Sequence, residues 1–215
     1  MDTLNTVREI AALHRKPRAP NRVAAIGSRL GGMRSLAWLS IAALAPFLPF
    51  LPLSAQQQHP TESQVKAAYL YNFGKFVRWQ SDRAGNSDFL ICVLGKDPFG
   101  ALLDATVEGE SIDGRKLTVR RIAKVQDGSS CSILYISSSE ESQLPSILSA
   151  AQHFGELTVS DIPRFAERGG VIGFVVQQDK IRFEVNRGAA GQSHLALSSE
   201  LLKVASKLYN KAVGQ

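Results

Sequence analysis

The feature that most constrains the fold of this chain is an apolar block over residues 36–53, in which Ser40 is the one hydroxyl residue. Arg29 and Arg34 precede the block, and Ser54 and Ala55 follow it, ahead of a run of glutamines. This is the arrangement of a secretory signal peptide: positive charge, apolar core, then small residues at a cleavage site. We therefore expect residues 33–55 to be a signal peptide cut after Ala55, and the folded part to begin at about Gln56.

A membrane anchor is the alternative interpretation of the same block. About eighteen apolar residues in a helix can cross roughly 30 Å of hydrocarbon. Pro46, Pro49 and Pro52 favour the signal peptide, because each proline removes a backbone donor and together they would break the last turns of a spanning helix.

Residues 1–32 lie upstream of this pattern, whereas a signal peptide normally starts within a few residues of its positive charges. Met33, directly before Arg34, would be a natural first residue. Our hypothesis is that translation starts at Met33. Residues 1–32 are then either a disordered basic leader or an extension that is not translated.

The net positive charge of the chain lies mostly in the leader. The whole chain carries a net charge of +6, with 25 Lys and Arg residues against 19 Asp and Glu. Seven of the basic residues but only two of the acidic ones precede Ala55, so the remaining part is almost neutral. Nucleic-acid binding requires a concentrated basic face, and we therefore expect no nucleic-acid partner.

Residues 56–215 have the length of one globular domain, without repeats or an internal linker. Apolar periodicity and turn residues predict helices and strands that alternate along the chain. The predicted helices cover residues 62–79, a short segment after Asp97, residues 140–151, a short segment around Phe165, and residues 198–208; the predicted strands cover residues 88–94, 117–122, 131–136, 156–159, 171–176 and 181–185. We expect an α/β fold, a three-layer sandwich in which helices flank both faces of a mixed β-sheet.

Sequence motifs for chemistry are missing. His153 and His194 stand alone without a second ligand at metal spacing, and the glycines around Gly95 are wrongly spaced for a phosphate loop. We expect no catalytic residues, no metal site and no cofactor, and hence no enzyme.

Cys92 and Cys131 are the two cysteines of the chain. In an exported protein such a pair suggests one disulfide. Closing a loop of about forty residues would stabilise the fold by roughly 4 kcal/mol. The alternative is two free thiols in the core, where cysteine behaves as a small apolar residue.

Eight segments, in order, resemble the YfiR family. They are residues 66–79 (KAAYLYNFGKFVRW), 91–95 (ICVLG), 112–115 (IDGR), 131–137 (CSILYIS), 157–161 (LTVSD), 169–172 (GGVI), 183–186 (FEVN) and 198–202 (SSELL). No single motif is diagnostic, but together the eight span nearly all of the part that follows the predicted cleavage site.

The resemblance implies a periplasmic protein, expected to be a homodimer, that binds the periplasmic sensor domain of a membrane-bound diguanylate cyclase. By repressing this cyclase it would lower cyclic di-GMP and restrain biofilm formation. Cys92 and Cys131 match one cysteine pair of the family, and the second pair is missing here, which leaves redox sensing open. A periplasmic protein that binds a small ligand is the alternative function.

For the partner-binding surface we predict Glu184, Asn186 and Arg187, which end the predicted hairpin. An equally simple interpretation is that Glu184 is the exposed position of an alternating strand and Asn186 a turn former.

Overall fold

The computed structural model describes residues 60–79 and 88–210, all within one compact unit, His59–Gln215. The predicted leader, start codon and signal peptide lie outside the described residues. Within residues 60–79 and 88–210, no helix is long and apolar enough to cross a bilayer.

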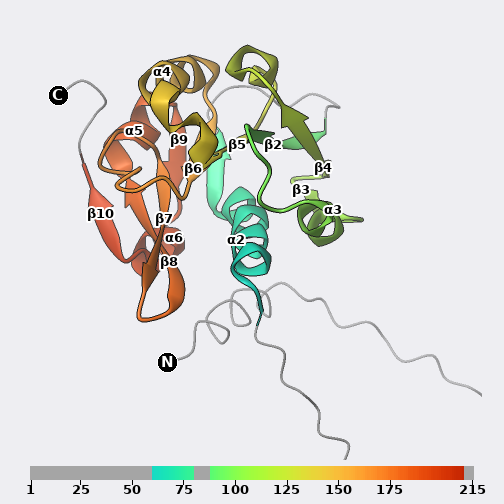
Figure 1. The fold of residues 1–215 in the computed structure, drawn as a ribbon, viewed down its shortest axis with the longest axis horizontal. Coiled ribbons are helices and arrows are strands. Elements are labelled where there is room, and N and C mark those ends of the chain that lie inside the picture. The colour runs from blue at the N-terminus through green and yellow to red at the C-terminus, as the bar shows by residue number, and fades with distance from the viewer. Residues whose placement is uncertain (1–59, 80–87, 211–215) are drawn as a thin grey trace, which may run out of the picture. The chain divides into compact units, whose positions relative to one another are not determined.

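A mixed sheet of eight strands forms the centre of the unit, in the order β10-β8-β7-β6-β5-β2-β4-β3 (Figure 1). Five consecutive strands of this sheet are parallel to one another, in the order β7-β6-β5-β2-β4. Strand β8 is antiparallel to β7, and β10 is parallel to β8. Their bounds are β2 (Phe89–Leu94), β3 (Ser111–Ile112), β4 (Arg115–Ile122), β5 (Ile133–Ile136), β6 (Leu157–Ser160), β7 (Ile172–Gln177), β8 (Lys180–Asn186) and β10 (Lys207–Tyr209). The predicted α/β fold with a mixed sheet is confirmed.

The helices lie between and beside these strands in the chain. They are α2 (Glu62–Phe76), α3 (Ala101–Val107), α4 (Leu144–Phe154), α5 (Arg187–Gln192) and α6 (Ser199–Val204), with two 3₁₀ turns, η1 (Val125–Gly128) and η2 (Ser138–Gln143). A separate two-stranded sheet pairs β1 (Val77–Trp79) with β9 (Leu195–Leu197).

Helix α2 packs on one face of the large sheet through its aromatic side chains. It begins with a capping box in which Thr61 and Gln64 exchange hydrogen bonds between side chain and backbone, as the predicted cap at Thr61 requires. The rings of Tyr69 and Phe73 lie 5.1–5.9 Å, centroid to centroid, from those of Phe174 and Phe183 on β7 and β8. This aromatic group holds α2 against the antiparallel half of the sheet.

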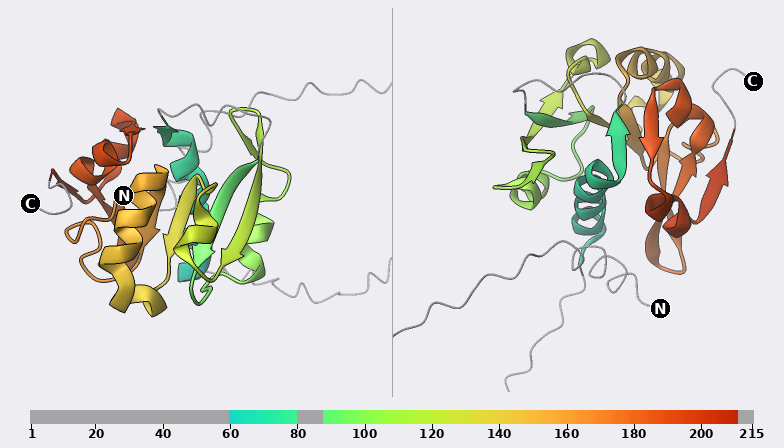
Figure 2. Two further views of the ribbon diagram at one scale, coloured as in Figure 1. Left: turned by 90° about the horizontal axis from the view of Figure 1, so that it is seen from above. Right: turned by 180° about the vertical axis from the view of Figure 1, so that it is seen from behind.

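Figure 2 shows α4 lying beside the large sheet. It packs against side chains of β2 and β5 that alternate with those facing α2. Phe89 of β2 points at Gly74 of α2, so Cys92 and Leu94, an odd number of positions further on, face the other way. Cys92 and Leu94 share a buried cluster with Leu148 of α4. Helices therefore contact both faces at the centre of the sheet, and the fuller description as a three-layer sandwich stays a prediction.

Three predicted helices were placed wrongly in part. The first helix ends at Phe76 instead of residue 79, because Val77–Trp79 pairs with β9. The last helix ends at Val204, and Lys207–Tyr209 forms β10. The segment around Phe165 is a series of turns in which Arg164 has φ +59°, a backbone angle that a right-handed helix does not contain.

Candidate functional site

The predicted contact residues lie where β8 ends and α5 begins. Glu184 is half-buried in β8, between Gly173 of β7 and Lys207 of β10. Its carboxylate accepts a hydrogen bond from the Tyr209 hydroxyl at 3.2 Å. Glu184 is thus partly available to a partner and partly engaged with the edge strand.

Asn186 is fully buried, with no exposed surface. Its Oδ1 accepts a hydrogen bond from the backbone N–H of Ala189 at 3.0 Å, which caps α5, and its Nδ2 donates to the carbonyl of Ala166 at 2.8 Å. A side chain with both polar ends used internally cannot itself contact a partner. The prediction of Asn186 as a contact residue is therefore corrected: the residue anchors α5.

Arg187 is exposed and is the first residue of α5. Its neighbour Asn186 is the N-cap of α5, and this cap fixes the direction in which α5 leaves β8. Of the three predicted contact residues, Arg187 is therefore exposed, Glu184 is partly exposed, and Asn186 is buried behind them.

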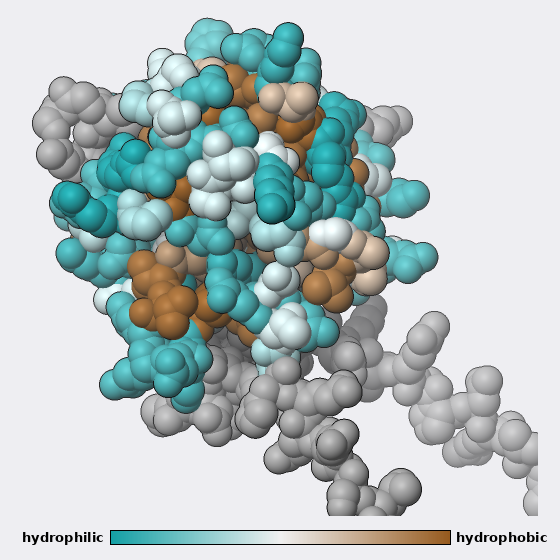
Figure 3. Space-filling model, viewed as in Figure 1, coloured by the Kyte–Doolittle hydropathy of each residue, from teal (hydrophilic) through white to brown (hydrophobic). Residues whose placement is uncertain are grey.

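Further along the same hairpin, the turn between β7 and β8 is exposed. Gln178 and Asp179 form this two-residue turn and both have positive φ, +51° and +56°. Val176 beside the turn is 63% exposed, the largest value among the exposed large apolar residues of the described ranges. Figure 3 shows such apolar side chains as small groups separated by polar ones on the face it displays.

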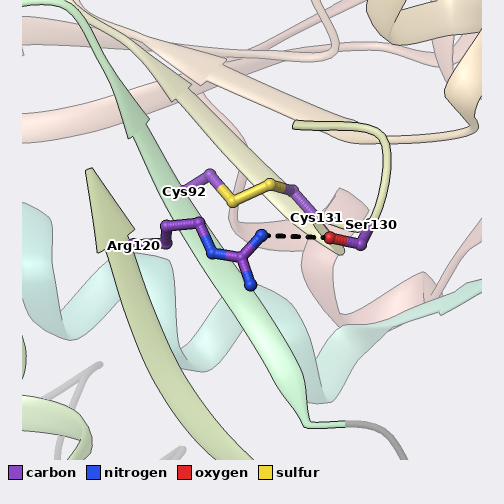
Figure 4. The surroundings of a disulfide bond; sticks show 4 residues. All are labelled: Cys92, Arg120, Ser130 and Cys131. Carbon is purple, nitrogen blue, oxygen red and sulfur yellow. Dashed lines mark hydrogen bonds between the residues drawn. A yellow bond between two sulfur atoms is a disulfide. The ribbon is translucent and has the colours of Figure 1, made fainter. Parts of the chain in front are cut away.

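Cys92 and Cys131 form a disulfide, as predicted (Figure 4). Both residues are fully buried, and their Cα atoms are 5.9 Å apart. The bond joins Cys92 in β2 to Cys131, which lies two residues before the start of the neighbouring strand β5. Beside it, the Arg120 guanidinium donates a hydrogen bond to the Ser130 hydroxyl at 3.3 Å.

An ion cluster around the buried Lys66, which the sequence analysis missed, lies between α2 and the end of β6. Lys66 is almost fully buried, and its Nζ is 2.6 Å from Asp161 Oδ2 and 2.5 Å from Glu62 Oε1. Burial alone would lower the pKa of Lys66, but the hydrogen bonds to the two carboxylates outweigh it and raise this pKa. Lys66 lies on the inner stripe of a helix, which is the signal that could have identified it.

A second group of charges, around Arg121 of β4, is also paired. Arg121 contacts Asp97 at 2.9 Å and Asp104 of α3 at 2.5 Å, and its hydrogen bond holds the pKa of Asp104 below the ordinary value. Asp97 was predicted to start a helix; instead its Oδ1 accepts a hydrogen bond from the Phe99 N–H at 2.7 Å, and α3 begins at Ala101. These charges tie β4 to the loop and helix that precede it.

The described residues hold no evident metal centre, and one cavity among them is small. No group of three His, Cys, Asp or Glu side chains there could hold a metal ion. One cavity beside α4 and α5, lined by residues that include Thr158 and Ser193, has a volume of about 10 Å³. That is the space of one water molecule, too small for a metabolite.

Comparison with known proteins identifies the family. The model of the YfiR/HmsC-like family matches residues 63–206. The chain belongs to the YfiR/HmsC-like family. The match confirms the family that the eight sequence segments indicated, and the proteins of this family are regulators rather than enzymes.

No curated protein matches this YfiR/HmsC-like chain. Among solved structures it is similar to a conserved domain protein from Vibrio cholerae, with 13% identity, a TM-score of 0.48, and coverage of 69% of this chain and 60% of the other. It is also similar to an ABC domain in complex with L-Trp from Streptococcus pneumoniae, with 12% identity, a TM-score of 0.41 and coverage of 56% and 55%. The chain thus spans less than two thirds of either protein, and we base no conclusion on these two likenesses.

The match includes Glu184, Arg187 and both cysteines of this YfiR/HmsC-like chain. It also includes Lys66 and Asp161, so this ion pair lies inside the family's domain. The surface at the end of β8 and the disulfide are therefore features of the matched domain and not of an added segment.

Proposed function

We propose that this protein is a periplasmic regulator that binds the periplasmic sensor domain of an inner-membrane diguanylate cyclase and represses the enzyme. The observation that carries the proposal is the match of the YfiR/HmsC-like family over residues 63–206. A repressor of this kind lowers cyclic di-GMP, and its release from the cyclase raises it.

The geometry supports docking more than chemistry. The charged side chains described above around Lys66 and Arg121 are engaged in internal ion pairs, and the small cavity beside α4 holds no more than a water molecule. Repression requires only that the regulator bind one state of the sensor domain more tightly than the other, because a ligand shifts an equilibrium by its differential affinity. An exposed surface on a rigid domain meets that requirement.

The proposed contact surface is the outer part of the sheet around the end of β8, with Arg187 and Glu184 as the direct contacts. Asn186 supports it from below by capping α5. A charged, solvent-exposed residue at the rim of an interface mainly affects the rate of association and the specificity of binding.

The first experiment deletes the gene and measures cyclic di-GMP. We expect the level to rise in the deletion strain and to return when the full-length gene is supplied. An unchanged level under several growth conditions would count against the proposal.

A second experiment tests the surface with Arg187→Glu. Reversing an exposed charge should weaken capture of the sensor domain, while stability is kept because an acidic side chain suits the first turn of a helix. Lys124→Glu, an exposed reversal just before η1, is the matched control and should bind as the unchanged protein does. Equal binding by both variants would remove Arg187 from the contact surface without touching the proposed regulator role.

A further inference from the structure

The chain contains two Asp-Gly steps, Asp113-Gly114 and Asp127-Gly128. A glycine after aspartate has no side chain beside its backbone nitrogen, so the carboxyl group of the aspartate can reach this nitrogen. Bond formation between the two closes a five-membered succinimide ring. Both steps have the groups for this reaction, and the folded structure decides which of them can react.

Asp113 and Gly114 form the two-residue turn between β3 and β4, and both are exposed. Ile112 and Arg115 pair across the turn, and the two turn residues have positive φ, +51° and +78°, as in a type I′ turn. The strand that leads into the turn, β3, has two residues and lies at one edge of the large sheet (Figure 1). A short exposed turn at an edge opens locally at a low cost in free energy.

The surroundings of Asp113 and Gly114 leave room for ring closure. A Cβ placed on Gly114 would meet no atom of the described residues within 4 Å. The carboxylate of Asp113 contacts the guanidinium of Arg78 in β1 at 3.4 Å, and both side chains are 63% exposed. An exposed ion pair of this length contributes little to stability. The carboxyl group of Asp113 and the nitrogen of Gly114 can therefore meet when the turn opens.

Asp127-Gly128 is packed differently. Gly128 is buried and is the last residue of the 3₁₀ turn η1. A Cβ placed on Gly128 would lie 3.1 Å from Ile122 Cδ1 and 3.2 Å from Glu156 Oε1, so this backbone is enclosed. The Gly128 carbonyl also accepts a hydrogen bond from the backbone N–H of Cys131, at 2.6 Å. Ring closure at Asp127 would require this buried segment to unfold.

We propose that Asp113 is a site of spontaneous aspartate isomerisation in the folded protein, and that the fold protects Asp127 from the same reaction. In the first step the Gly114 nitrogen bonds to Cγ of Asp113, and the carboxyl hydroxyl leaves as water with the amide proton. In the second step water adds to the backbone carbonyl carbon of Asp113, whose bond to the nitrogen breaks. The product is isoaspartate, with no change in mass and no transfer of electrons.

Isoaspartate changes the turn in two ways. The backbone then runs through Cβ and Cγ of residue 113, which adds one methylene group to the turn, and the free carboxylate is attached directly to Cα. A type I′ turn matches the twist of its flanking strands only with two residues of ordinary length. We therefore expect loss of the contact with Arg78 and weaker pairing of Ile112 with Arg115. This inference does not depend on binding to a cyclase, since β8 lies toward the opposite edge of the sheet.

The test follows isoaspartate in the full-length gene product, purified as the cell processes it. The protein is stored warm at mildly acidic pH, where part of an aspartate carboxyl group is protonated. Trypsin cuts after Arg115 and Lys124, which puts the two steps on different peptides. An isoaspartyl peptide keeps its mass, elutes at a different time, and resists an endoproteinase that cleaves before aspartate. In the folded protein, isoaspartate at Asp113 should exceed that at Asp127 at least about tenfold, because a buried step reacts only after it opens.

Urea provides the control, because unfolding exposes both steps, and Asp113 and Asp127 should then isomerise at similar rates. Asp113→Glu should abolish the reaction at this position, since the longer side chain would have to close a six-membered ring. Asp127→Glu is the matched control and should leave the rate at Asp113 unchanged. No isoaspartate at Asp113 in the folded protein, equal amounts at both steps, or an unchanged signal in Asp113→Glu would overturn the proposal.

Discussion

At the scale of single residues, Asn186 joins two distant segments through one buried side chain. Asn186→Ala removes the cap of α5 and leaves the Ala166 carbonyl without this donor. We expect the free energy of unfolding to fall by about 2–4 kcal/mol, the sum of a lost cap and an unsatisfied buried group. Urea denaturation followed by circular dichroism measures the loss.

Asn186→Asp is the informative partner variant. It keeps an oxygen that can accept from the Ala189 N–H but has no Nδ2 to donate to Ala166. It should therefore lose stability while α5 stays capped, and sensor binding should fall only in proportion to unfolding. A stable Asn186→Ala protein that no longer binds would restore Asn186 as a direct contact.

Tyr135 gives a prediction in alkaline solution. Its ring is fully buried in β5, and burial, together with the nearby Asp161 carboxylate, raises the pKa of its hydroxyl well above 10. Above pH 10 the unfolded chain ionises this phenol and the folded chain does not, so the native protein loses about 1.4 kcal/mol per pH unit through this group.

Tyr135→Phe removes that loss. Relative to the unchanged protein, the variant should gain stability as pH rises beyond 10, whatever its difference at pH 8. Urea titrations across this interval provide the measurement. Parallel pH profiles for the two proteins would contradict the assignment.

The contact residues show how far single positions can be predicted. Glu184 and Arg187 are accessible, as alternation along a strand suggests. Asn186 is not accessible, because it caps a helix with the sequence RGAAGQ, whose two glycines predict no helix.

Lys66 was missed because an ammonium on the inner stripe of a helix needs carboxylates from elsewhere in the chain, and local sequence does not show Asp161 beside it.

At the scale of elements, the β7–β8 hairpin carries a turn that its residues do not favour. Gln178 and Asp179 both adopt positive φ, which suits Asn and Gly. Gln178→Asn with Asp179→Gly should raise the free energy of unfolding by about 1 kcal/mol, because the left-handed strain is relieved. Asp179→Val should have the opposite effect, and thermal melts of both variants check the sign.

The disulfide stabilises the link between β2 and β5. Replacing Cys92 and Cys131 together by Ala should cost about 4 kcal/mol, because the unfolded chain regains the freedom of a loop with a sequence separation of 39 residues. Denaturant midpoints with and without reductant provide the test. Reductant should lower the midpoint of the unchanged protein toward that of the double variant and leave the variant unaffected.

Most buried elements could be predicted, and most edge elements could not. Strand β2 has a continuous apolar run, and β7 and β8 flank a short polar turn, so local pattern predicts them. Strands β1, β9 and β10 have three residues each and exist because a distant strand pairs with them. Such short segments carry no periodicity of their own, which is why β1 and β10 were assigned to neighbouring helices.

At the scale of the whole molecule, export stays a prediction that the amino terminus can test. Cleavage after Ala55 predicts that the protein recovered from the periplasm begins at Gln56 and lacks the apolar block of residues 36–53. Mass spectrometry of the intact natural protein measures this directly. A cytoplasmic protein that retains the block would contradict both the signal peptide and the proposed site of action.

The order of strands across the sheet lies beyond local sequence. The chain passes from β2 to β4 on one side and then returns to β5 on the other side of β2. Nothing in the individual segments specifies this return. The pairing of Cys92 with Cys131 is in keeping with it, because a disulfide requires β2 and the start of β5 to be neighbours.

The same covalent link has a mechanical consequence. Tension applied to the two ends of the chain passes from β2 to β5 through the sulfur atoms and never reaches the segment between them, which holds α3 and β4. With a sequence separation of 39 residues, that segment would add about 130 Å to the stretched chain if the bond were cut, at about 3.4 Å per residue. While the disulfide is intact, an applied force cannot extend this segment.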